Sequence, residues 1–77
     1  MFKRQIKIKA LVAALRQLGF VERRTASHGI FSQPESGLIV TLPMGRKDVP
    51  VVYLKAILKQ IVDRGIMAED DFLELLN

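Results

Sequence analysis

The residue of this chain best suited to chemistry is His28, the only histidine among 77 residues. It follows Arg23 and Arg24 and precedes a short apolar run, Ile30-Phe31. Imidazole is the side chain whose ordinary pKa lets it give and take a proton near neutral pH. On a strand edge within a basic surface, a histidine suits proton transfer on a phosphodiester. The alternative is a polar residue of an edge strand that has no catalytic role.

Among phosphodiesters, RNA needs the fewest catalytic groups from such a site, because it carries its own nucleophile, the 2′-hydroxyl. The protein must take the proton of that hydroxyl, hold the phosphate in line and stabilise the developing negative charge. One histidine with nearby cations meets these needs without a metal ion. The chain has no cysteine, hence no disulfide and no thiolate ligand, and no carboxylate cluster for a metal is visible. We therefore expect neither a metal nor an organic cofactor.

Charge is unevenly distributed along the chain, whose net charge is +4. Residues 1–60 carry eleven lysines and arginines against three acids, a net +8, whereas residues 61–77 have a net charge of −4. A basic body indicates a polyanion as partner, although a solvated lysine-rich surface has the same composition. The Ser27 hydroxyl, in turn, bonds either a phosphate or the backbone. The candidates for contacts with the phosphates of such a partner are Arg23, Arg24, Ser27, Arg46, Lys47, Lys55 and Lys59.

Hydrophobic spacing and turn residues predict six elements. Ile8, Leu11 and Leu15 lie on one face of a helix, and Gly19 suits the position just after its end. Alternating apolar and β-branched residues predict strands further on. The predicted elements are a helix over residues 7–18, strands over 20–24, 27–32 and 38–42, a helix from Val51 to near Gly65, and a short helix over 68–76.

These elements predict one α+β domain over residues 1–77, with the order α-β-β-β-α and a short extra C-terminal helix. The segments between the strands are too short for parallel crossovers, so the three strands form an antiparallel sheet. We expect the helices to cover one face of the sheet and leave the other open. Because strand side chains alternate between faces, His28 lies on the open face if Phe31 is in the core, and points inward if Ile30 is.

The order of the elements and several local strings resemble the HicA toxins, also called YcfA-like mRNA interferases. Residues 26–31, Ala-Ser-His-Gly-Ile-Phe, resemble the family's Gly-Ser-His-His-x-Phe hairpin. No single string is specific, but their order and spacing are, and together they cover nearly the whole chain. The other matching strings are Leu-Arg-Gln-Leu-Gly-Phe at 15–20, Leu42-Pro43 followed by Arg46-Lys47, Leu-Lys-Ala-Ile-Leu-Lys-Gln at 54–60, and Glu-Asp-Asp-Phe-Leu at 69–73.

The resemblance implies a fold like that of double-stranded-RNA-binding domains and the function of a type II toxin: an endoribonuclease that cleaves mRNA. His28 matches the family's catalytic histidine. The implied partners are RNA and a HicB-like antitoxin protein. No apolar run is long enough to span a membrane and no signal peptide is visible at the start, so a cytoplasmic protein is expected.

The chain departs from the family pattern around the histidine. Ala26 replaces a usual glycine, Gly29 replaces the second histidine, and Thr25 stands where a lysine is common. The link at residues 61–67 also differs. These departures leave open a non-catalytic RNA-binding module of the same fold. A third reading is a small interaction protein whose basic face meets an acidic protein.

Overall fold

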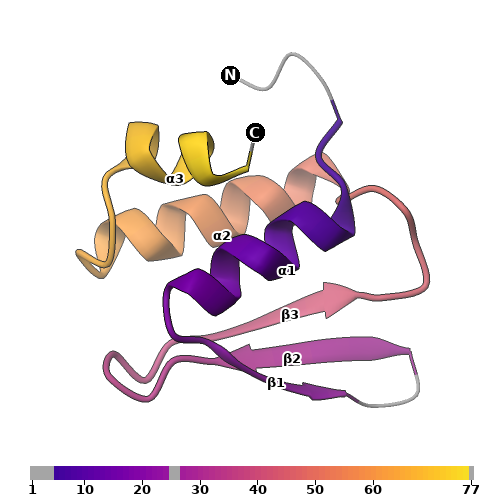
Figure 1. The fold of residues 1–77 in the computed structure, drawn as a ribbon, viewed down its shortest axis with the longest axis horizontal. Coiled ribbons are helices and arrows are strands. Elements are labelled where there is room, and N and C mark those ends of the chain that lie inside the picture. The colour runs from indigo at the N-terminus through magenta and orange to yellow at the C-terminus, as the bar shows by residue number, and fades with distance from the viewer. Residues whose placement is uncertain (1–4, 25–26, 77) are drawn as a thin grey trace.

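The computed structural model describes residues 5–24 and 27–76, without the side chain of Arg24. Its order is the predicted one, helix, three strands and two helices, and the ends of the elements lie within one or two residues of the predictions (Figure 1). The elements are α1 (Ile8–Gln17), β1 (Val21–Arg24), β2 (His28–Ser32), β3 (Ile39–Pro43), α2 (Val51–Asp63) and α3 (Glu69–Leu75).

Helix α1 forms on the stripe that its sequence predicts. Ile8, Leu11 and Leu15 are all buried, and the intervening charged residues are exposed. The helix ends because Gly19 takes a left-handed backbone conformation, with φ of 88°, which an L side chain rarely adopts. The backbone N–H of Phe20 donates to the carbonyl of Leu15 across this end, which turns the chain into β1.

The sheet is antiparallel with the strand order β1-β2-β3, so β2 is the middle strand. His28, the first residue of β2, pairs with Pro43 of β3. The expectation that His28 lies on an edge strand is therefore wrong. Two consecutive hairpins place the second strand between the other two, because each tight connection returns the chain to an adjacent position in the sheet.

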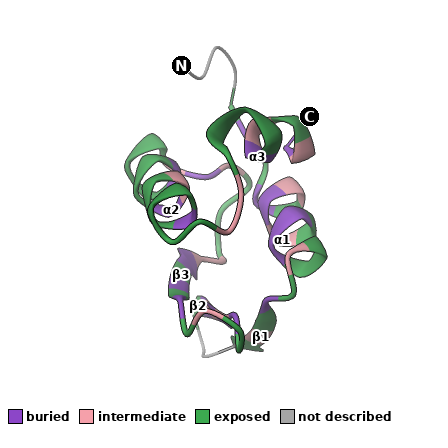
Figure 2. Ribbon diagram, turned by 90° about the vertical axis from the view of Figure 1, so that its left-hand side faces the viewer, coloured by how far each residue is buried: buried purple, intermediate pink, exposed green. Residues whose placement is uncertain are grey.

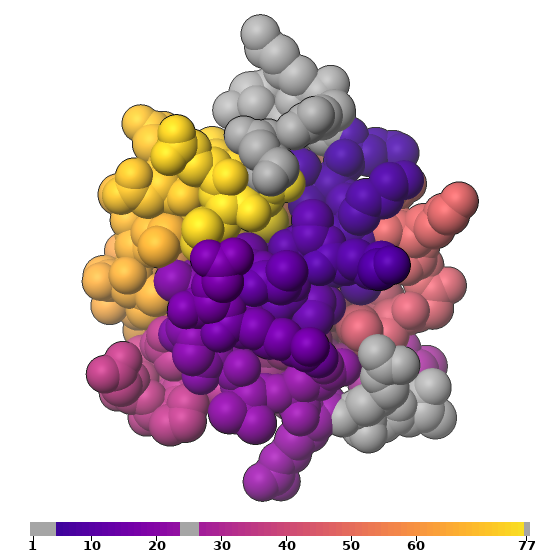
Figure 3. All heavy atoms as spheres, in the orientation of Figure 1, coloured from indigo at the N-terminus to yellow at the C-terminus, as the bar shows by residue number. Residues whose placement is uncertain are grey.

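The helices α1 and α2 lie side by side over one face of the sheet, and α3 lies across them on the far side (Figure 2). In the space-filling view the atoms of α3 abut those of α1 (Figure 3). The core fills the space between the sheet and the helices, with Phe31 and Leu42 from the strands completely buried. None of the helices in the described part of the chain lies over the opposite face of the sheet (Figures 1 and 2). The predicted one-sided architecture is confirmed.

The two C-terminal helices complete this core. Leu54, Ile57 and Ile61 of α2 are buried, and α3 contributes Phe72, which is also fully buried. Three acids stand in the first turn of α3, where negative charge is favourable beside the positive end of the helix dipole. Within the part of the chain described, no helix is long and apolar enough to cross a membrane.

Candidate functional site

His28 lies on the uncovered face of the sheet. In β2 the buried residues are Gly29 and Phe31, whereas His28 is exposed and Ile30 and Ser32 are half-buried. Alternation along a strand therefore sends the imidazole away from the helices. The sequence left two orientations open, and the burial of Phe31 selects the one in which His28 is accessible to a large ligand.

The imidazole of His28 has a hydroxyl neighbour. The Oγ atom of Ser27 lies 3.0 Å from Nδ1 of His28. If the serine donates, Nδ1 is the acceptor and the ring proton is on Nε2. If Nδ1 donates, Nε2 carries the lone pair and is a base. This contact couples the tautomer of the ring to the hydroxyl of Ser27. Ser27 therefore orients the histidine whether or not its own hydroxyl also contacts a ligand.

Arg23 shares this face with His28. It pairs across the sheet with Ile30, two residues along β2 from the histidine and on the same side. Arg24 pairs with Gly29, which faces the helices, and its side chain is outside the described atoms. Of the two arginines, Arg23 is the one whose described position is on the face of His28. Thr25 and Ala26 lie outside the described residues.

The basic loop between β3 and α2 lies at the end of the sheet where β2 begins with His28 (Figure 1). The N–H of Met44 donates to the carbonyl of Ser27 at 3.2 Å, which extends the β2–β3 pairing past His28. Further along, the N–H of Ile8 donates to the carbonyl of Lys47 at 2.8 Å and ties the loop to the start of α1. Arg46 and Lys47 are both exposed on this loop, close in the chain to the residues paired with the histidine's strand.

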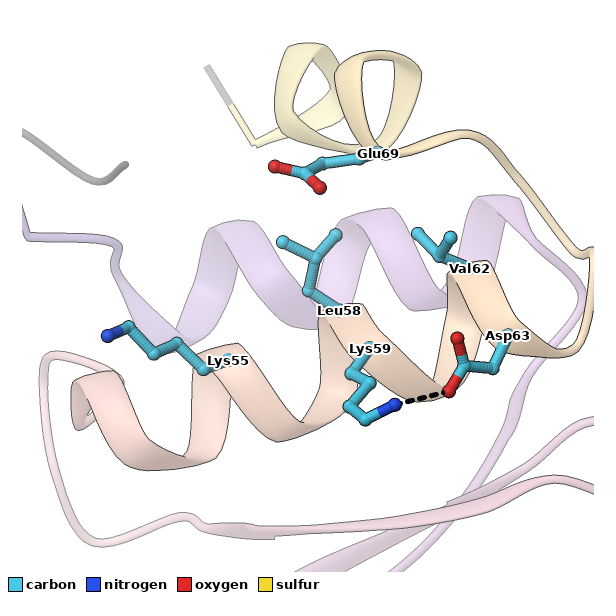
Figure 4. Close-up of a pocket in the computed structure, with 6 residues that line it drawn as sticks. All are labelled: Lys55, Leu58, Lys59, Val62, Asp63 and Glu69. Carbon is cyan, nitrogen blue, oxygen red and sulfur yellow. Dashed lines mark hydrogen bonds and ion pairs between the residues drawn. The ribbon is translucent and has the colours of Figure 1, made fainter.

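Lys55 and Lys59 occupy a different surface, a groove of about 310 Å³ between α2 and α3 (Figure 4). Nζ of Lys59 donates to a carboxylate oxygen of Asp63 at 2.7 Å, and Glu69 also lines the groove. The hydrogen bond and the charge of Asp63 raise the pKa of Lys59 above its ordinary value of 10.5. The structure does not bring these lysines onto the open sheet face with His28.

Gly29, one of the departures near the histidine, has a structural cause. A Cβ atom built there would lie 2.9 Å from both Cγ and Sδ of Met44 and 3.0 Å from Cε1 of Phe31. Met44 thus fills the space on the helix side of the sheet that a larger residue at position 29 would need. Sequence reasoning gave Met44 no role, because its contact with Gly29 depends on how the loop folds back.

Further residues share the open face with His28 but were not among the predicted site residues; those nearest the histidine are Ile30, Thr41 and Pro43. Strand alternation counted from His28 and from the buried Leu42 would have found them. Among residues 5–24 and 27–76, no three histidine, aspartate or glutamate side chains come together as a metal site.

The fold and this end of the sheet define a small α+β protein with one helix-covered and one uncovered sheet face. A sequence model of the HicA toxins of bacterial toxin–antitoxin systems matches residues 8–61, from the start of α1 almost to the end of α2. The chain therefore belongs to the HicA toxin family. A comparison with curated protein sequences finds no match. The family implies an antitoxin protein as partner.

Proposed function

We propose that this toxin is a histidine-dependent endoribonuclease that acts on mRNA in the cytoplasm. The observation that carries the proposal is the exposed imidazole of His28 on the helix-free face, oriented by Ser27 and flanked by Arg23. Membership in a toxin family also supports the proposal, because cleavage of a cellular polymer such as mRNA is harmful to the cell. The basic loop gives it a means of holding a polyanion.

The reaction balances with groups that RNA and the site supply. His28 takes the proton of a 2′-hydroxyl, and the 2′-oxygen attacks the adjacent phosphorus. The bond from phosphorus to the 5′-oxygen breaks, and that oxygen leaves with a proton that the imidazolium of His28 returns through water. The products are a 2′,3′-cyclic phosphate and a 5′-hydroxyl. The guanidinium of Arg23 stabilises the charge that develops on the phosphate oxygens.

The loop cations hold the flanking backbone. Arg46 and Lys47 are exposed, so their charges are available to phosphates on either side of the scissile bond. Such contacts do not read sequence; they fix the position of the strand. Lys55 and Lys59 are weaker candidates than the sequence suggested, because Asp63 and Glu69 lie with them in the groove.

The antitoxin, which we take to be HicB-like, acts by covering His28. A net +8 over residues 1–60 attracts an acidic protein through the same charges that attract RNA. Amide exchange of the complex tests this directly. Protection over β2 and the basic loop supports blocking, whereas protection confined to residues 66–77 contradicts it.

The nuclease proposal is tested with a defined RNA and its 2′-deoxy counterpart. The purified toxin is expected to cut the RNA and leave a 2′,3′-cyclic phosphate. A single 2′-deoxy substitution on the 5′ side of the cleaved bond should abolish cutting there, because the nucleophile is gone. Cleavage of the substituted strand, or binding of RNA without cleavage at any site, would contradict the proposal; the latter is the behaviour of a binding module.

A further inference from the structure

Two strongly exposed aliphatic residues stand on the same face of the sheet as His28. Val21 is 53% exposed and Ile39 is 60% exposed, and each is the first residue of its strand. Val21 pairs with Ser32, and Ser32 pairs with Ile39. The three residues therefore form one row straight across the sheet, with the serine in the middle; we call it the distal row.

The distal row has a definite shape. Neighbouring strands lie about 4.8 Å apart, so the backbones that carry Val21 and Ile39 are about 10 Å apart. Two branched side chains thus flank the small hydroxyl of Ser32. Ser32 is four residues from His28 along β2, which at about 3.3 Å per residue places the row about 13 Å from the histidine.

The open face of the sheet, from His28 to the distal row, carries almost no charge. Of the strand side chains that the structure describes on it, Arg23 alone is charged. The others are Val21, His28, Ile30, Ser32, Ile39, Thr41 and Pro43. Single-stranded RNA is held by cations and by aromatic rings on which its bases stack. The distal row offers neither, so RNA gains little from it.

We propose that the distal row anchors the antitoxin, by receiving a branched or aromatic apolar side chain between Val21 and Ile39. The proposal rests on the proposed function, because it assumes that the partner covers the His28 face. A protein interface of ordinary size buries about 800 Å² on each partner, which is ample to span the 13 Å or so between the histidine and the row. A few fully desolvated contacts carry most of the binding energy of such an interface, and an apolar side chain of the partner seated in the row would be one of them.

This arrangement separates two tasks on one face. The end with His28 and Arg23 acts on RNA, and the distal row distinguishes the antitoxin from RNA. It follows that the row can be altered to release the toxin from its partner without harm to catalysis. A partner held only through the cations could not be separated from RNA in this way, because both would lose the same contacts.

The test compares the double variant Val21→Thr/Ile39→Thr with the wild-type toxin. Threonine keeps the β-branched shape that strands favour but replaces a methyl group of Val21, or the ethyl group of Ile39, with a hydroxyl. A second variant, Ile39→Asp, places a charge in the row. The matched control is Val52→Thr, because Val52 is an exposed valine, at 79%, on α2. Circular dichroism and thermal melting confirm that each variant is folded.

The partner used is the product of the reading frame adjacent to the toxin's own. Both row variants are expected to weaken its binding by about tenfold or more, while RNA cleavage and the Val52→Thr control stay at the wild-type level. Wild-type partner affinity in both row variants would overturn the proposal. Dimerisation of the wild-type toxin through this row would also overturn the proposal. It would be shown by a dimeric wild-type toxin and monomeric row variants.

Failure of the proposed function is distinguishable from failure of this inference. If the wild-type toxin does not cleave RNA, the nuclease proposal fails. The loss of partner binding in the row variants still supports the anchor, since that affinity is measured without RNA.

Discussion

Two surfaces of this toxin carry pairs of cations, and they differ in what lies beside them. In the groove between α2 and α3, Lys59 is bonded to Asp63, and Lys55 shares the lining with Glu69 (Figure 4). On the loop next to the histidine, Arg46 and Lys47 are exposed. The loop's one acid, Asp48, is engaged by Lys7 at 3.4 Å.

The difference shows that a count of lysines does not locate an anion site. In the groove the negative charges of Asp63 and Glu69 oppose the potential that two lysines create. On the loop, the salt bridge with Lys7 offsets the charge of Asp48, and the potential of Arg46 and Lys47 remains. RNA should therefore respond to changes in the loop and largely ignore changes in the groove.

The largest difference between the two surfaces is expected in RNA affinity. Neutralising Arg46 and Lys47 together as glutamines should weaken binding roughly equally for all RNA sequences, because phosphate contacts carry no sequence information. The slope of log affinity against log salt should fall by about 1.4 for two contacts on single-stranded RNA. Affinity measured over a series of salt concentrations gives both quantities.

The matched control is the double variant Lys55→Gln/Lys59→Gln, which removes the same charge from the groove. It should leave the salt slope close to the wild-type value. If the two double variants lower the slope equally, RNA does not distinguish the surfaces and the comparison fails.

The second effect concerns how closely the histidine strand is packed. Gly29→Ala places a Cβ against Met44 and Phe31, and overpacking of this kind costs about 1–3 kcal/mol. The melting temperature should fall by about 4 °C or more. In a Met44→Ala background the same change should cost less, because two of the three close contacts are then absent. An equal cost in both backgrounds would show that Met44 is not what excludes a side chain at position 29.

The smallest effect is expected from Asp63→Asn in the groove. Asp63 raises the pKa of Lys59 above 10.5, so the stabilisation it gives is present at neutral pH and is lost only as pH rises through that raised value. The variant should return the pKa of Lys59 toward 10.5. Because both groups are exposed, the melting temperature at neutral pH should not change measurably. NMR titration of the lysine checks the first statement, and a wild-type pKa in the variant contradicts it.

Much of the fold follows from local sequence. The stripe of Ile8, Leu11 and Leu15 determines α1, and Gly19 marks its end. Alternation about Phe31 gives the face on which His28 lies, once Phe31 is known to be in the core. The spacing of Lys59 and Asp63, four residues apart on one helix, also predicts their ion pair, although sequence reasoning did not use it.

The rest depends on contacts between distant segments. The sequence does not show that Met44 folds back over Gly29, because the path of the loop is fixed by its bonds to Ser27 and to the start of α1. Nor does it show that Lys55 lies in a groove with an acid of α3, since that needs the packing of Phe72 into the core. Sequence reasoning therefore named His28, Ser27 and Arg23 as candidates, but not the contact of Met44 with Gly29 or the groove around Lys55.

The most direct test of the account is the rate of RNA cleavage by His28→Ala under single-turnover conditions, with RNA affinity and melting temperature measured on the same sample. The exposed position of His28 means that the variant should fold as the wild type does. The account predicts that cleavage is lost while RNA binding stays within about twofold, because the cations that hold the backbone are unchanged. A folded His28→Ala protein that cleaves RNA at the wild-type rate would contradict it.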